Sequence, residues 1–221
     1  MKNLSFLFCL LALQTLYSQQ IYKFDYEIKY QYNYATKNYN DIRSYLINSK
    51  DNSYFAVKIP IRKNKYKLIV QDYNGLRAEQ VFKLEEFEKP SLLISLFNAA
   101  SFTNKHKNII NDYDFNNHDD TIIDGNRLKN IRLSATNKKL KENKNVGQKI
   151  YLVDPKFNFL PLLALSTEYE IWQARTNFPN GLLMRSYFLG SDNKIINSFI
   201  FKEIIQRNFT VNYYNYIPKK N

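Results

Sequence analysis

The chain has 221 residues, with 32 Lys plus Arg against 20 Asp plus Glu, and its formal net charge is +12. Five Gly and six Pro exclude a collagen-like or Pro/Gly-rich chain. The 44% apolar and 16% aromatic content excludes charge-rich disorder, and a single Cys excludes a disulfide scaffold.

Residues 1–18 are predicted to be a secretory signal peptide. Lys2 gives a short basic start, an apolar run follows over 4–16, and Ser18 is a small residue suited to cleavage. The alternative is a buried N-terminal strand or helix. Cys9 follows the bulky Phe8 inside the apolar run, so it does not suit a lipoprotein signal. We therefore expect an exported chain, in the periplasm or at the cell surface or beyond it, that has no disulfide after cleavage.

The mature chain is expected not to be an integral membrane protein. The apolar run at the start is too short for a transmembrane helix, and no later segment has about 18 uncharged apolar residues in succession. One domain, residues 19–221, is predicted because no linker and no internal repeat is visible.

The first predicted strand spans 22–34. Aromatic residues and one Ile occupy every even position from Tyr22 to Tyr34, and polar residues fill the odd positions. Strict alternation is typical of an antiparallel strand with one apolar face and one wet face. We interpret the aromatic stripe as core rather than as a ligand platform.

Four more strands are predicted to complete a meander. Pro60 is expected to end the third strand, residues 49–52 form a turn, and Asn74-Gly75 predicts a tight hairpin. The four predicted strands cover 41–48, 53–59, 65–73 and 76–84.

The second half is predicted to mix helices and strands. Pro90 and the apolar spacing after it favour a helix over about 90–100, and a second helix is predicted over 161–173. Residues 104–117 read as polar and irregular, and 138–148 as a charged loop. Further strands are predicted over 121–124, 127–136, 149–154, 182–189, 194–204 and 208–217. The predicted fold class is mainly β: a large curved antiparallel sheet or half-barrel, with about two helices on its concave side.

The acidic segment 112–124 is a weak candidate for a calcium loop. Its candidate ligands at alternating positions are Asp112, Asp114, Asn116 and Asp120, with His118 between them. The register fails, since Asn117 stands where Gly is needed and Ile123 where a bidentate Glu is needed. We expect a solvated acidic loop and no metal.

The basic segment 127–149 is a candidate for contact with an anionic surface. It carries eight Lys or Arg against Glu142 alone. It could instead pair with the acidic segment, although exposed pairs are worth only about 0–1 kcal/mol each. The proposed contact residues are Arg127, Lys129, Arg132, Lys138, Lys139, Lys141 and Lys144.

The overall positive charge is otherwise weak evidence for a partner. Lys outnumbers Arg by 24 to 8 and Asn reaches 28, a pattern typical of AT-rich coding sequence. Readers of nucleic acid rely on Arg for base contacts, and export separates the chain from DNA. Nucleic acid is therefore not expected as a partner.

No motif for catalysis is visible. The chain lacks a G-x-S-x-G elbow and a P-loop, and Cys9 lies in the signal. His106 and His118 lack zinc spacing, and Glu168 and Glu170 do not share a helical face. We predict no catalytic residues, no cofactor and no enzymatic activity.

Several segments resemble exported Bacteroidetes proteins of the uncharacterised GLPGLI family. They are the signal ending in Ser-Gln-Gln, the Tyr-rich first strand, residues 45–54, and Asn-Phe-Thr-Val-x-Tyr over 208–213. Residues 178–183, Phe-Pro-Asn-Gly-Leu-Leu, stand at the family's eponymous turn, but Asn177 and Phe178 replace its leading Gly-Leu and Asn180 is inserted. The family's layout is similar to that of periplasmic lipoprotein carriers of the LolA type, an analogy of fold only.

Three functions remain open from the sequence, of which an enzyme, which needs polar groups that converge in a pocket, is the least favoured. The first is a binding module whose curved sheet holds an apolar ligand or lipid, such as an acyl chain, or part of a partner; the surplus of aromatic residues on strand faces suggests it. The second is a structural or interaction protein of the cell envelope that contacts a protein partner or an anionic surface.

Overall fold

The computed structural model describes residues 20–35, 39–101, 103, 107–137, 139–140 and 147–214. The predicted signal peptide, Cys9, His106, Lys138, Lys141 and Lys144 lie outside these residues. The strands are β1 Ile21–Tyr34, β2 Tyr39–Asn48, β3 Asp51–Arg62, β4 Lys65–Asp72, β5 Leu76–Lys83, β6 Ser91–Ser95, β7 Ala99–Ser101, β8 Tyr113–Ile123, β9 Asn126–Ala135, β10 Gln148–Asp154, β11 Leu182–Leu189 and β12 Ile195–Tyr214. The helices are α3 Ser166–Arg175 and the 3-10 turns η3 Leu84–Glu88, η4 Leu96–Asn98 and η5 Lys107–Asn111.

The strands form one sheet, which confirms the predicted mainly β class. Its order is β7-β5-β4-β3-β2-β1-β12-β11-β10-β9-β8, and every neighbouring pair in this path is antiparallel. β6 is added beside the end of β12 and pairs with it in parallel. The predicted meander over the first five strands is therefore correct.

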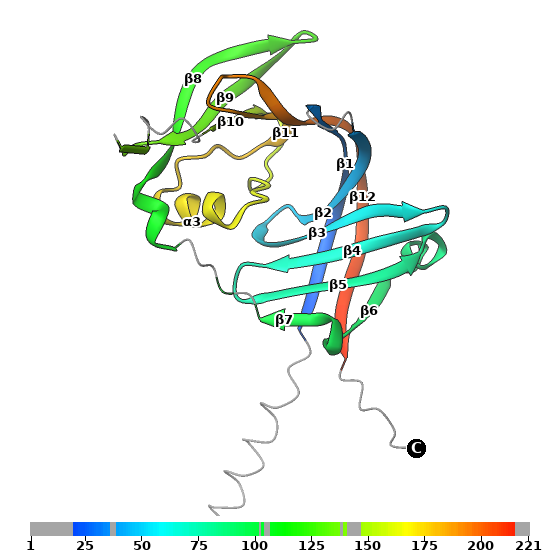
Figure 1. The fold of residues 1–221 in the computed structure, drawn as a ribbon. Helices are drawn as coiled ribbons and strands as arrows, with labels where there is room; N and C mark the ends of the chain where they lie inside the picture. Colours follow the sequence, from blue (N-terminus) through cyan, green and yellow to red (C-terminus); the bar gives the residue numbers. More distant parts are fainter. Residues whose placement is uncertain are drawn as a thin grey trace, which may run out of the picture.

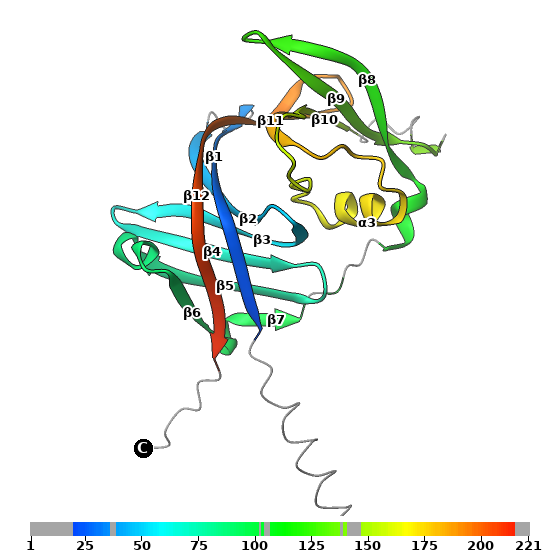
Figure 2. The same cartoon turned by 180° about the vertical axis from the view of Figure 1, so that it is seen from behind.

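The long strands β1 and β12 run side by side and join two curved regions (Figure 1). Strands β2–β7 curl on one side of this pair, and β8–β11 arch over α3 on the other. The view from behind shows the same division, with α3 between the arch and strands β2 and β3 (Figure 2). Of the two helices predicted, the described residues contain one, α3.

The aromatic stripe of β1 does not lie on one face. Tyr22 and Phe24 belong to one core cluster, whereas Ile28 and Tyr30 belong to a second cluster. The register with β12 shifts between Phe24 and Tyr26, where a bulge changes the side to which the residues point. The prediction of one wet face is therefore wrong for β1, because the sheet is covered on both sides.

We call one side of β2–β4 the closed face; it bears Leu46, Ala56, Leu68 and Val70. These side chains are almost fully buried, and β6 and η3 cover them. The opposite side, the open face, bears Tyr45, Ile47, Phe55, Val57 and Ile69. The alternation of side chains along a strand places neighbours such as Ala56 and Val57 on opposite faces.

A buried ionic cluster lies on the closed face. Glu27 is 2% exposed, Lys58 Nζ lies 2.6 Å from its Oε1, and Arg207 Nη2 lies 2.7 Å from its Oε2. Burial alone would raise the pKa of Glu27, but Lys58, Arg207 and Ser44 hold that pKa below its usual value. The closed face is thus filled by apolar side chains and by charges that the chain itself neutralises.

The helix predicted over 90–100 is wrong. Residues 91–95 form β6, in which Leu92 and Ile94 are buried and Leu93 is 56% exposed. The leucines are also compatible with helical spacing, but the end of β12 offers an unpaired strand edge that fixes β6 as a strand. The second predicted helix exists but begins at Ser166, and residues 157–165 before it form no regular helix or strand.

Two strand assignments also differ from prediction. β3 continues through Pro60, which pairs with Tyr66 of β4 beyond the point where the pairing of β2 with β3 ends, at Lys58. The two strands predicted over 194–204 and 208–217 are one strand, β12, and the predicted break coincides with its bulge against β1.

No helix in the described part of the chain combines the length and apolar composition that crossing a bilayer requires.

Candidate functional site

A cleft of about 340 Å³ lies between the open face and the segment 164–166. Pockets for small ligands typically have volumes of about 300–1,000 Å³ and mostly apolar walls. The residues that line the cleft come from β2, β3, β4, the β4–β5 turn, β5 and the start of α3: Arg43, Tyr45, Phe55, Val57, Ile59, Ile69, Gln71, Tyr73, Arg77, Ala164, Leu165 and Ser166. Most of the floor is aliphatic or aromatic, so it can take apolar surface out of water.

The irregular segment 157–165 covers part of the open face. Its main chain is bonded to the sheet, since Leu160 N donates to Ser49 O at 2.9 Å and the Tyr73 hydroxyl donates to Leu163 O at 2.6 Å. Phe159 packs on Tyr26 with ring centroids 4.6 Å apart. The cover is therefore fixed to the sheet on either side of Pro161, and it leaves the cleft open beside it.

A second, inner cavity adjoins the cleft. Its volume is about 20 Å³, and Tyr45 and Ala164 line both spaces. The other residues around it are Tyr30, Lys149, Leu162, Leu183, Ser186 and Phe199. A cavity of this size holds about one water-sized group.

The buried carboxylate of Glu168 anchors the start of α3 beside the inner cavity. Its Oε1 accepts from Lys149 Nζ and from the Tyr151 hydroxyl, each at 2.6 Å, and its Oε2 accepts from Leu165 N at 3.2 Å. Glu168 is fully buried and Lys149 nearly so. Burial, with Glu168 nearby, raises the pKa of Tyr151 and of Tyr73, so both phenols stay neutral.

Two arginines line opposite edges of the cleft. Arg43 lies 3.6 Å from the ring centroid of Tyr32, and its Nε donates to Asp41 at 3.2 Å. Arg77 Nη2 donates to Glu79 Oε1 at 2.6 Å. Both cations have carboxylate partners, so the cleft as a whole is apolar with balanced charges at its edges.

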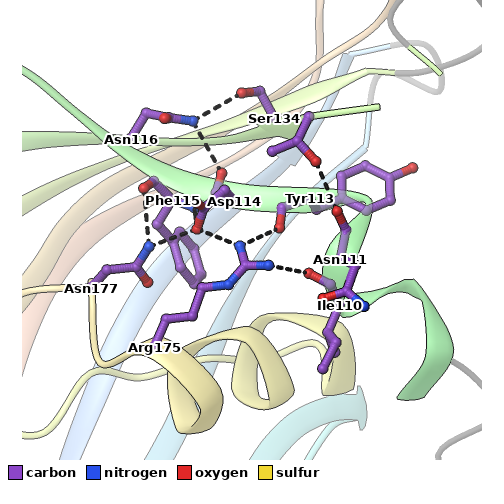
Figure 3. Close-up of polar contacts among 10 residues, drawn as sticks. Ile110, Asn111, Tyr113, Asp114, Phe115, Asn116, Ser134, Arg175 and Asn177 are labelled. Carbon is purple, nitrogen blue, oxygen red and sulfur yellow. Dashed lines mark hydrogen bonds and ion pairs between the residues drawn. The ribbon is translucent and has the colours of Figure 1, made fainter. Parts of the chain in front are cut away.

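A polar clamp fixes the end of α3 against β8 (Figure 3). Arg175 Nη1 lies 2.8 Å from Asp114 Oδ1, and its two terminal nitrogens donate to Tyr113 O and Ile110 O at 3.0 Å each. Asn177 Nδ2 donates to Asp114 Oδ1 at 2.6 Å. Burial opposes ionisation of Asp114, but Arg175 and Asn177 hold its pKa below the usual value.

The predicted acidic loop is wrong: residues 113–123 form β8. Strand geometry separates the candidate calcium ligands, and the sheet uses them otherwise. Asp114 binds Arg175, Asp112 accepts from Asn137 Nδ2 at 3.2 Å, and Asn116 donates to Ser134. Within the described ranges, no group of three or more His, Cys, Asp and Glu could hold a metal ion.

Part of the basic segment pairs with the acidic one. Asp120 Oδ2 lies 2.7 Å from Arg127 Nε and 3.1 Å from Lys129 Nζ, across the β8–β9 hairpin. Arg132 is partly buried on β9 and Lys139 is exposed. Contact of this segment with an anionic surface stays a prediction.

The sequence did not reveal the cleft, the inner cavity or the Lys149–Glu168 pair. The sequence offers Glu168 no acidic neighbour on its helical face, since Glu170 lies on another, whereas its partner in the fold is Lys149 on β10. A signal did exist: Glu168 stands three residues after Leu165, where a carboxylate caps a helix start. His118 lies exposed on β8, with no predicted role.

Neither a protein-family model nor a curated protein sequence matches the chain. Among solved structures, MucB aligns with a TM-score of 0.41 and 8% identity over 82% of this chain and 53% of its own. The chain thus spans about half the length of MucB. An outer membrane lipoprotein-sorting protein domain from Vibrio parahaemolyticus aligns with a TM-score of 0.31 and 10% identity, over 82% of this chain and 85% of its own.

A DUF1329 family protein from Desulfovibrio piger aligns with a TM-score of 0.28 and 8% identity, over 89% of each chain. At such low identities and TM-scores, these likenesses say nothing about the ligands or partners of this chain. The resemblance to the GLPGLI family stays a prediction.

Proposed function

We propose that the chain is a non-enzymatic binding module that holds an elongated apolar ligand, such as an acyl chain, in the cleft on the open face. The carrying observation is a cleft of about 340 Å³ whose floor is formed by Tyr45, Phe55, Val57 and Ile69. An apolar floor next to a fixed cover removes an alkyl chain from water at about 25 cal/mol per Å² buried.

The polar groups of the cleft support binding rather than chemistry. The Tyr73 hydroxyl donates to Leu163 O, and Gln71 Nε2 donates to Asp72 O at 3.3 Å. Arg43 and Arg77 are held by carboxylates. These contacts shape the cleft, and each of the four side chains is engaged in one of them.

The proposal places this module in the cell envelope. The basic start, the apolar run and Ser18 support removal of residues 1–18 and export to the periplasm or the cell surface. Residues 19–221 then form a single β-rich domain, and membership of the GLPGLI group is part of the same proposal.

Native mass spectrometry and displacement of a fluorescent fatty acid test the proposal. We expect the purified chain to carry a lipid or to bind the probe, and Ile69→Trp to weaken probe binding by about tenfold because the indole fills the cleft. Ile195→Trp adds the same ring at a strand position 46% exposed and outside the cleft, and serves as the control. Absence of bound lipid and of probe binding in the wild type would overturn the proposal.

A second candidate is an interaction protein of the envelope that acts through its surface. Leu93 and Phe97 are 56% and 70% exposed, and the side chain of Gln80 joins β5 to β6 and η4 next to them. Exposed apolar residues gathered in this way are typical of protein contacts.

Pull-down from salt-washed envelope fractions tests the second candidate. Recovery of a specific partner by the wild type but not by Phe97→Ser would favour the second candidate. Recovery of the same amount of partner by the wild type and the variant would count against it. Binding to anionic vesicles that falls with added salt and with Arg127→Gln would separately support a basic surface contact.

A further inference from the structure

The inner cavity is lined by apolar side chains and by residues that carry hydrogen-bond donors. Lys149 Nζ has three N–H groups, and one of them is used by Glu168. Tyr45 and Ser186 also line the cavity, and neither side chain has a hydrogen-bond partner among the described residues. Both residues are buried, at 6% and 2% exposed.

Lys149 offers donors only, and the two hydroxyls can donate as well as accept, so an acceptor oxygen without a proton can pair with all three. Buried polar groups are nearly always paired, and donors that face a cavity are paired by water or by a ligand oxygen. Glu168 already neutralises Lys149, so the cavity does not require an anion. A neutral carbonyl oxygen and a carboxylate oxygen both satisfy it.

The inner cavity lies at the end of the apolar floor. Tyr45 and Ala164 line both spaces, and from β2 the floor continues over β3 and β4 to β5. Three strand spacings correspond to about 14 Å. An alkyl chain laid across these strands would therefore start from the Tyr45 hydroxyl and run toward Arg77.

We infer that the inner cavity binds the carbonyl oxygen of an acyl group whose alkyl chain occupies the cleft. This inference rests on the proposed function and names its ligand class: a free fatty acid or an acyl chain in ester or amide linkage. The cavity of about 20 Å³ has room for one oxygen atom, and Tyr45, Ser186 and Lys149 supply its hydrogen bonds.

The test compares dodecanoic acid, methyl dodecanoate and dodecane as competitors of a fluorescent fatty acid. We expect the wild type to bind the acid and the ester at least tenfold more tightly than dodecane. Combined Tyr45→Phe and Ser186→Ala should weaken binding of the acid and the ester by about tenfold and leave that of dodecane unchanged. Tyr26→Phe is the matched control, because Tyr26 packs on the same core but lines neither cavity.

Lys149 needs a compensated variant, since Lys149→Met alone would leave Glu168 buried without its cation. Lys149→Met with Glu168→Gln removes both charges, and circular dichroism checks that it folds. The Tyr45/Ser186 pair keeps the test decisive if this variant does not fold.

The outcomes separate the inference from the proposed function. Tight binding of acid and ester alike supports carbonyl recognition of free or linked chains, and tight binding of the acid alone supports it for free fatty acids. Equal affinity for all three competitors, or no effect of the Tyr45/Ser186 variant, overturns the inference while the apolar binding function stands. If none of the three binds, the proposed function itself fails.

Discussion

On the closed face of β2–β4, the chain's own β6 and η3 cover the sheet, whereas on the open face the segment 157–165 covers only part of it. Both faces carry alternate residues of the same strands, such as Ala56 and Val57 of β3. Both also lie near a buried carboxylate. Glu27 is enclosed by packed side chains, while Glu168 lies beside a cavity. The difference shows that a buried charge pair can stand either in a filled core or in the wall of a cavity.

The largest effect is expected from breaking the charge cluster of the closed face. Glu27→Gln leaves Lys58 buried without an anion, and the free energy of unfolding should fall by about 3 kcal/mol. Urea denaturation measures it. Glu203→Gln is the control, because the Lys29–Glu203 pair is 2.8 Å long but half exposed and should cost under about 1 kcal/mol. Equal losses in the two variants would contradict the contrast.

The same substitution on the two faces should give opposite results. Ala56→Phe overfills the closed face at a fully buried position and should lower the free energy of unfolding by about 2 kcal/mol or prevent folding. Val57→Phe projects into the cleft, so it should cost less than about 1 kcal/mol and instead weaken fatty-acid binding. Denaturation and probe displacement on both variants measure this. Equal destabilisation would mean that the open face is as filled as the closed one.

The free energy of unfolding should also depend on pH through Glu27, with a smaller effect than that of the substitutions above. Because the folded state lowers the pKa of Glu27 from about 4.5, its stabilisation is complete above that pH and is lost as the pH falls through the lower folded pKa. Free energies of unfolding between about pH 6 and pH 3 should fall more steeply for the wild type than for Glu27→Gln. Parallel curves would exclude Glu27 as the source.

The smallest effect is expected at the α3 clamp, which supports the arch around the open face. Arg175→Met removes the pair with Asp114 and two bonds to main-chain carbonyls, and should cost about 1 kcal/mol because these groups are partly exposed. Hydrogen exchange should increase at the end of α3. The control is Arg127→Met, because the Arg127 side chain is 78% exposed. This variant should not change hydrogen exchange at the end of α3.

The alternation of apolar residues located most strands correctly, but it could not show which faces would be covered. Tyr22 to Tyr34 predicted β1 almost to the residue, yet the bulge after Phe24 sends its aromatic residues to opposite sides. Leu92 and Ile94 fit a strand or a helix equally well, and only the free edge of β12 decided between them. The polarity of the acidic segment predicts a loop, but the segment is the edge strand β8, where polar residues can face water.

None of the candidate site residues predicted from sequence lines the cleft. The cleft joins β2–β5 to residues 164–166, and its inner wall adds Lys149 and Ser186 from β10 and β11. Contacts between residues so distant in the chain have no local periodicity, so spacing cannot reveal them.

The sequence by itself determined the mainly β class, the first five strands and the absence of an intramolecular disulfide, because local alternation and residue counts are sufficient for these. Only the tertiary structure decided that one face of β2–β4 is covered fully and the other in part, that Asp114 clamps α3 and that Glu168 pairs with Lys149. These features arise where strands far apart in sequence meet, and their energies depend on burial and distance, which exist only in the folded chain.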